Sequence, residues 1–255
     1  MAIFTSGNDI QTLKEAGRRL ARILDEVAKD VRPGVTEKEL DEKARRLIEE
    51  GGDTSAFLGY TPRGAKEPYP ATLCVSVNDK VVHGIPSARP LKEGDIVAID
   101  IGLSHEGIIV DMAKTYAVGR VSPDAARLIA VTEESLAAGI AAARARGHVG
   151  DIGHAVETLV QNAGFEVVYE LGGHGVGKKL HEGPFIPNFG TKGRGEKLTE
   201  GMVLALEPIV TLGSSDIELD EDGYTYTTKD GSLAAHFEHT ILLTEKGAEV
   251  ITKNI

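Results

Sequence analysis

Two segments of this chain repeat one pattern, in which a glycine turn leads into an apolar strand that ends on an acid. Residues 91–100 read LKEGDIVAID and residues 198–207 read LTEGMVLALE, and the two align position by position. A carboxylate that follows a buried strand is costly unless it is paired or binds a metal ion. The repeat therefore predicts an α/β fold built from two related halves, with Asp100 and Glu207 close to the pseudo-symmetry axis.

Each copy of the repeat follows segments with the apolar spacing of helices. The spacing predicts a helix from about residue 10 to 29, and Thr36 with Glu39 forms a capping box that opens a second helix ending at Gly51. The other predicted elements are helices from residue 122 and around 155–160, and strands over 73–77, 81–82, 95–101 and 107–110.

The composition limits the classes of function. A net charge of -11 argues against a protein whose main task is neutralising nucleic-acid phosphates. Cys74 is the single cysteine, so no intramolecular disulfide is expected. No uninterrupted apolar run reaches about 18 residues and no signal peptide is recognised, which favours a cytoplasmic protein without a membrane segment. No low-complexity linker interrupts the chain, so we expect a single domain over residues 1–255 with a short N-terminal extension of about 1–10.

Four carboxylates and one imidazole stand where chemistry can be expected. Asp100 follows IVAI, Asp111 follows IIV, Glu207 follows MVLAL, Glu238 precedes an apolar run, and His174 lies in GGHGVG. Any one of these acids alone is more commonly a cap or a surface partner. Together they balance the charge of two divalent cations, and an oxygen-rich set with one nitrogen suits Mn, Fe, Co or Zn. Two ions about 3.5–4 Å apart can activate water and polarise a carbonyl for hydrolysis.

Seven short motifs give the chain a specific resemblance, which runs from about residue 14 to the C-terminus. They are VVHGIP at 81–86, IDIG at 99–102, VDMAKT at 110–115, GHGVG at 173–177, HEGP at 181–184, LEP at 206–208 and FEHT at 237–240. In this order they resemble type I methionine aminopeptidases. The resemblance implies the pita-bread fold, in which two αβ halves surround a curved antiparallel sheet with the metal site in its middle. It also implies a monomeric enzyme that removes the initiator methionine from nascent polypeptides with a small second residue, by attack of a hydroxide activated by two metal ions.

The resemblance further implies a role for each candidate residue. Asp100, Asp111, His174, Glu207 and Glu238 bind the two metal ions, and the acids at 111 and 238 bridge them. His83 contacts the substrate near the scissile amide, His181 stabilises the tetrahedral oxyanion, and Glu207 shuttles the proton. An imidazole that donates a hydrogen bond where negative charge develops stabilises the transition state more than the ground state.

The methionine pocket is expected around a few apolar side chains. Cys74 matches a position that lines this pocket in many bacterial members of the family, where a thiol packs softly against a thioether. Tyr69 and Tyr224 are expected to form further walls. Cys74 could equally be a small buried side chain without a functional contact.

Several positions depart from the family pattern. Gly102 stands where several relatives have a threonine close to the metals, Leu180 where a phenylalanine is common, and Tyr224 where many have tryptophan. Residues 61–68, including Arg63 and Lys66, lengthen the loop before the pocket, and we expect this insertion to be solvated rather than to touch substrate.

Other functions remain open at this point. A pita-bread peptidase of the Xaa-Pro-specific kind usually carries an extra N-terminal domain and lacks the HGIP context of His83, and a non-enzymatic binding protein on this fold typically loses metal ligands. The segment around His174 superficially resembles a dinucleotide-binding loop, but no strand–loop–helix unit with a downstream acid accompanies it. Charge totals leave docking on the ribosome undecided.

Overall fold

The computed structural model describes residues 3–62 and 64–254. Within them the elements are α1 (Gly7–Ala28), α2 (Glu37–Glu50), β1 (Thr54–Ser55), β2 (Leu73–Val77), β3 (Lys80–Val82), β4 (Ile96–His105), β5 (Ile108–Ala117), α3 (Pro123–Ala142), α4 (Val149–Asn162), β6 (Glu166–Val167), β7 (Gly172–Gly175), β8 (Glu182–Pro187), β9 (Val203–Leu206), β10 (Ile209–Thr211), β11 (Ile217–Leu219), β12 (Tyr226–Thr228), β13 (Ala234–His236), β14 (His239–Thr244) and β15 (Gly247–Val250).

The helix starts follow local sequence signals. Before α2, Thr36 Oγ1 accepts a hydrogen bond from the Glu39 amide at 3.2 Å, and the Glu39 carboxylate accepts one from the Thr36 amide at 2.7 Å. This confirms the predicted capping box, which satisfies amides that would otherwise lack a partner. The helix α1 begins at Gly7, three residues earlier than the spacing alone predicts.

The first half of the sheet is an antiparallel layer in the order β1-β4-β2, with β5 paired to β4. The hairpin β4–β5 runs from the pair Ile96–Ala117 to the pair His105–Ile108. The predicted strands, 95–101 and 107–110, are too short here, because a buried acid was expected only near the end of a strand. Asp100 and Asp111 instead lie within their strands, since both line a shared interior cavity together with other polar side chains.

The second half is a sheet in the order β15-β14-β9-β7-β8. It meets the first half where the amide of Glu238 donates to the carbonyl of Ala113 at 2.8 Å, and the amide of Ala113 donates back at 3.4 Å. This seam places the turn between β13 and β14 directly beside β5. Two small sheets, β13-β10-β6 and β11-β12-β3, complete the fold.

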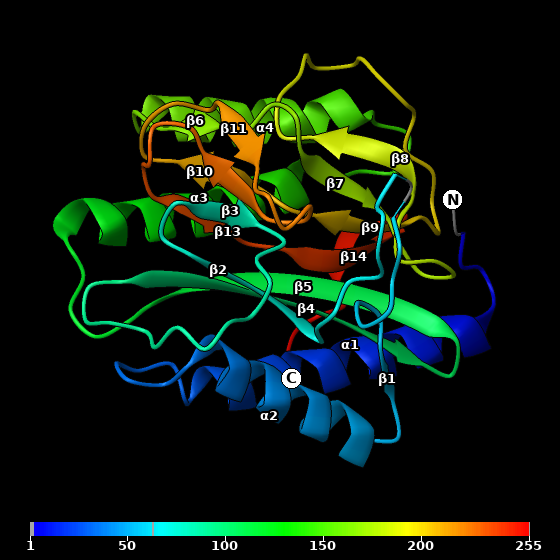
Figure 1. Ribbon diagram of the computed structural model, residues 1–255. Helices are drawn as coiled ribbons and strands as arrows, with labels where there is room; N and C mark the ends of the chain where they lie inside the picture. The colour runs from blue at the N-terminus through cyan, green and yellow to red at the C-terminus, as the bar shows by residue number, and fades with distance from the viewer. Residues whose placement is uncertain (1–2, 63, 255) are drawn as a thin grey trace.

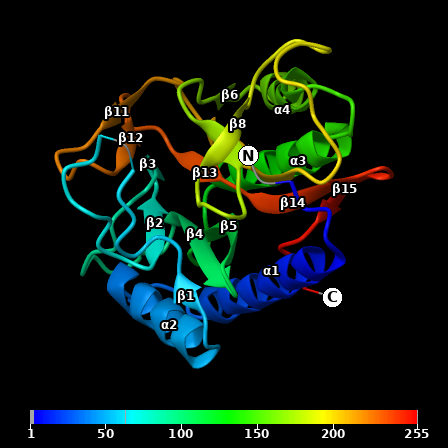
Figure 2. The same cartoon turned by 90° about the vertical axis from the view of Figure 1, so that its right-hand side faces the viewer.

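Helices cover the joined sheet from two sides (Figures 1 and 2). The pair α1 and α2 lies below the strands in Figure 1 and packs its apolar side chains against β2, β4 and β5. The pair α3 and α4 lies above, where α3 packs against β9 and β14. This arrangement confirms the predicted two αβ halves around an antiparallel sheet. Among the described residues, no helix is both long and apolar enough to span a bilayer.

Candidate metal centre and active site

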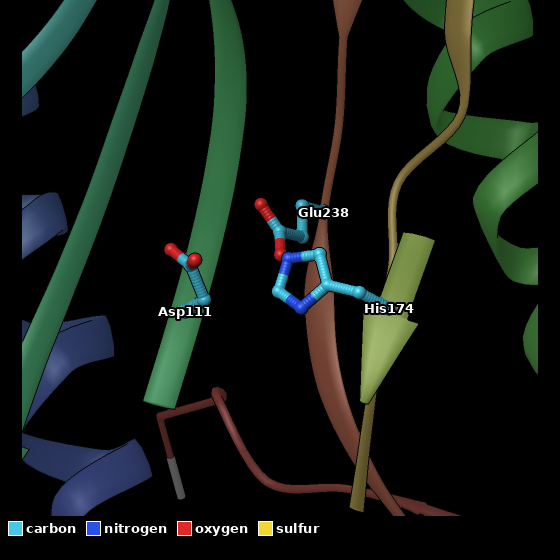
Figure 3. Close-up of side chains that lie close together, drawn as sticks. All are labelled: Asp111, His174 and Glu238. Atoms are coloured by element: carbon cyan, nitrogen blue, oxygen red, sulfur yellow. The ribbon is translucent and has the colours of Figure 1, made fainter. Parts of the chain in front are cut away.

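The five predicted metal ligands come together from both halves of the fold. Asp100 lies in β4, Asp111 in β5 and His174 in β7, whereas Glu207 follows β9 and Glu238 stands between β13 and β14. All five line one cavity. Figure 3 shows Glu238 beside the imidazole of His174, with Asp111 facing them from β5 in the other half of the fold.

The spacing of these side chains suits metal binding. One ligand atom each of Asp111, His174 and Glu238 lie within 4.8 Å of one another. Nε2 of His174 lies 3.5 Å from Oε1 of Glu207. Asp100 lies close to Asp111. The donor atoms therefore surround one small volume, as a bound cation requires.

The hydrogen bonding of the cluster is incomplete, as expected of ligands. Asp100 Oδ1, Asp111 Oδ1 and Glu238 Oε1 are buried without a hydrogen-bond partner. Buried carboxylate oxygens without partners are expensive unless a cation completes them. Nδ1 of His174 lies 2.9 Å from the carbonyl oxygen of Gly175, to which it donates. That tautomer directs the lone pair of Nε2 at the cluster, which is the usual arrangement for a ligating histidine. The residues therefore fit divalent cations.

The electrostatics of the cluster show how much these acids need positive charge. Burial raises the pKa of Asp100 to about 7. Burial, and then the neighbouring acids, raise the pKa values of Asp111 and Glu238 well above their usual range. The pKa of Glu207 is raised by burial and by Asp100. Burial lowers the pKa of His174 to about 3, so the imidazole is neutral and able to ligate.

Two further histidines, His83 and His181, line the same cavity. Burial lowers the pKa of His83 to about 4, and lowers that of His181 as well. Tyr60 holds His181 in place through its hydroxyl, which lies 2.8 Å from Nδ1. Burial raises the pKa of Tyr60, so the phenol stays protonated and donates to Nδ1. The N–H of His181 is then on Nε2 and free to donate to a bound group.

Tyr60 is a site residue that the sequence reasoning missed. It lies 121 positions from His181 along the chain. The one available signal was its place next to the 61–68 insertion, a few residues before Tyr69.

One side of the cavity is apolar. Cys74 and Tyr69 are buried there, with Phe57 and Leu180 in the same cluster and Tyr224 packed against it. The Tyr69 hydroxyl donates to carbonyls of the adjoining backbone, at 2.9 Å to Leu73 and 3.0 Å to Gly84. Its polar end is satisfied, so the ring presents an apolar face to the cavity.

The family departures have structural counterparts. A Cβ on Gly102 would lie 2.8 Å from the ring of Phe57, so the missing side chain leaves the space that this ring occupies. Of the 61–68 insertion, Pro62 lines the cavity, and the carbonyl of Glu67 accepts a hydrogen bond from the Tyr224 hydroxyl. Most other positions of the insertion are exposed, and Arg63 lies outside the described residues.

The histidines that flank Glu238 differ in orientation. Nε2 of His236 lies 3.6 Å from Glu207 and 3.9 Å from Glu238, so His236 stands directly behind two of the acids. His239 turns away and pairs through Nδ1 with the Thr252 hydroxyl at 2.9 Å. Only the first is placed to orient ligands.

The fold and the acid-lined centre define a class of metallopeptidase. Metallopeptidase family M24 matches residues 11–245, and the chain belongs to this family. Within it, the chain is 44% identical over 253 residues to "Methionine aminopeptidase 1" of Bacillus subtilis (strain 168), covering 99% of this chain and 100% of that protein. The full-length match confirms the predicted resemblance to the methionine aminopeptidases.

Solved structures agree with this assignment. The crystal structure of methionine aminopeptidase from Thermotoga maritima superposes with a TM-score of 0.95 at 41% identity and covers 100% of both chains. The Xaa-Pro dipeptidase from Bacillus anthracis shares the fold, with a TM-score of 0.77, but is 22% identical and this chain covers 63% of its length.

Proposed function

We propose that this chain hydrolyses the first peptide bond of polypeptides that begin with methionine, with a preference for a small second residue. The observation that carries the proposal is one cavity with two unlike sides. Four buried carboxylates and an imidazole form one side, and an apolar pocket around Cys74 and Tyr69 forms the other. The pocket suits an unbranched thioether side chain, and the polar side suits hydrolysis of the adjoining bond.

The proposed cofactor is a pair of divalent cations, which Asp100, Asp111, His174, Glu207 and Glu238 would hold. When bound, such ions polarise a carbonyl and make water acidic enough to react at neutral pH. Mn²⁺, Fe²⁺, Co²⁺ and Zn²⁺ all accept this donor set.

The remaining polar residues act on the peptide itself. His181 presents Nε2–H toward the cavity, where it can donate to the oxygen that gains negative charge as the carbonyl is attacked. His83 lines the same space and can hold the scissile amide. Glu207 adjoins His174 and lines the cavity, so it is placed to carry a proton from the attacking water to the leaving amine.

Substrate choice follows from how closed the apolar pocket is. The rings of Tyr69 and Tyr224 pack edge to face with centroids 5.1 Å apart. The backbone of the 61–68 loop is tied to Tyr224 through Glu67. These contacts fix the size of the pocket and disfavour charged or β-branched first residues.

The proposed function implies a location and an assembly state for the protein. A cytoplasmic monomer acting on nascent chains is the expected form, and docking on the ribosome is a further part of this proposal. A Xaa-Pro-specific activity is disfavoured, because the Xaa-Pro dipeptidase match supports the fold alone. A purely binding role is disfavoured because all five ligand positions are retained.

Peptide hydrolysis tests the proposal. Purified protein is incubated with Mn²⁺ and with Met-Ala-Ser, Leu-Ala-Ser, Met-Lys-Ser or a Xaa-Pro dipeptide, and released amino acids are quantified. We expect free methionine from Met-Ala-Ser and little product from the other three. Release from the Xaa-Pro dipeptide instead would replace the proposal with that specificity.

A further inference from the structure

A second hollow leads out of the metal centre along a different apolar wall. It is lined by Val82, Leu171 and Phe185, together with His83, His174, His181 and Glu207. The last four residues also line the central cavity, so the two hollows adjoin at these side chains. A polypeptide whose first side chain fills the methionine pocket must continue past the scissile bond, and this groove is the continuation.

The position of Phe185 explains why the groove is apolar next to a charged centre. Phe185 pairs directly with His174 between β7 and β8. Directly paired residues project from the same face of a sheet, so the Phe185 ring stands one strand away from the ligating imidazole, about 5 Å between Cβ atoms.

The ring of Phe185 lies against the backbone of β7 at Gly172, which has no side chain. A Cβ on Gly172 would lie 3.3 Å from Cζ of Phe185, so the glycine allows the ring to lie across β7. Phe185 is nevertheless 54% exposed, one of five large hydrophobic side chains exposed among the described residues. Phe185 lines the same hollow as Leu171 and Val82, and a contiguous apolar patch beside a site indicates a binding surface.

Strand β8 is also the last strand in the order of its sheet among the described residues. An edge strand is a place where an extended chain can pair with a sheet. An extended polypeptide advances about 3.3 Å per residue. If the second residue lies at the metal centre, the third and fourth residues reach Phe185 and Leu171.

We propose that the groove formed by Val82, Leu171 and Phe185 binds the third and fourth residues of the substrate polypeptide and favours apolar side chains there. This inference rests on the proposed function, because it needs the methionine to occupy the neighbouring pocket. The enzyme then selects substrates by residues beyond the small second one, so that Met-Ala-Leu-Ser is preferred over Met-Ala-Asp-Ser.

Rates of methionine release across a series of peptides test the proposal. The kcat/KM for methionine release is measured on Met-Ala-Xaa-Ser and Met-Ala-Ser-Xaa, with Xaa as Leu, Phe, Ser or Asp, for wild type and Phe185→Ser. The matched control is Leu219→Ser, which removes a side chain of similar exposure, 52%, on β11. The readout is the ratio of Leu to Ser peptides within each protein, which cancels differences in active fraction.

Wild type and Leu219→Ser are expected to favour the Leu peptide about five- to tenfold, the effect of burying one apolar side chain partway. Phe185→Ser is expected to reduce that ratio to about two or less. Equal rates for Leu and Ser peptides in wild type, or an unchanged ratio in Phe185→Ser, would overturn the groove while leaving methionine release intact. Failure to release methionine from any of these peptides would instead overturn the proposed function, and the groove with it.

Discussion

Replacing Asp100 by asparagine is expected to change stability in opposite directions with and without metal. Burial raises the pKa of Asp100 from 3.8 to about 7. At about 1.4 kcal/mol per pKa unit, keeping this carboxylate charged in chelated protein at pH 7 costs up to about 4 kcal/mol. Asparagine has a similar shape and no charge, so Asp100→Asn removes that cost. At the same time the substitution removes a proposed metal ligand.

The assay is thermal unfolding followed by circular dichroism, in EDTA and in Mn²⁺. Chelated Asp100→Asn is expected to melt several degrees above chelated wild type, since about 1 kcal/mol corresponds to roughly 2–4 °C in a chain of this size. Added Mn²⁺ is expected to raise the melting temperature of wild type strongly and that of the variant much less.

The pH dependence provides a second check with a defined sign. A folded pKa above the unfolded one gives stability that is complete below pH 3.8 and is lost as the pH rises through about 7. Chelated wild type should therefore gain stability from pH 8 to 6.5, and Asp100→Asn should gain less. Below pH 6.5 the trend weakens, because His83 and His174, with pKa values lowered to about 4 and about 3, must be kept neutral.

Asp95→Asn is the matched control, one strand position before β4. Asp95 accepts hydrogen bonds from Asn78 and Arg89 at 2.8 and 2.9 Å, and its pKa is lowered, so it is an ordinary paired acid. Its loss should cost about 1–3 kcal/mol with and without metal. If Asp100→Asn behaved like this control, the reasoning that makes Asp100 a ligand would be refuted.

Two further substitutions address the residues around the centre. Tyr60→Phe removes the hydrogen bond to His181 and should lower kcat about three- to tenfold with little change in KM. Steady-state kinetics on Met-Ala-Ser measure both constants. An unchanged kcat would mean that Tyr60 does not position His181. Gly102→Thr should push the ring of Phe57 toward the cavity and raise KM severalfold, and Gly102→Ala should raise KM less. Equal KM values in wild type and both variants would show that the ring can move elsewhere.

The sequence predicted most of the fold because the governing signals are local. Capping at Thr36 and the spacing of apolar residues in α1 set those elements without help from distant contacts. The limits of β4 and β5 were missed for a physical reason. A charge in a buried strand is normally excluded, and the proposed cation that would offset it here is held jointly with residues from the other half of the fold.

The site was predicted in its polar part and less fully in its surroundings. The five candidate ligands were predicted from their strand context and their motifs, and the structure places these residues around one cavity. The bond from Tyr60 to His181 and the contact of Phe57 with Gly102 depend on how loops cross the site, which no local pattern encodes. Phe185 likewise becomes notable only once its pairing with His174 is known.

Metal-dependent methionine release by wild type and Asp111→Ala tests the central claim most directly. Each protein is chelated, resupplied with increasing Mn²⁺, and assayed on Met-Ala-Ser, with circular dichroism recorded on the same samples. Wild type should regain activity, and Asp111→Ala should stay below about 1% of it with an unchanged spectrum, because the proposed metal centre would lose one of its carboxylates. Near-normal release by the variant, or full activity of wild type in EDTA, would contradict a metal centre built on these acids.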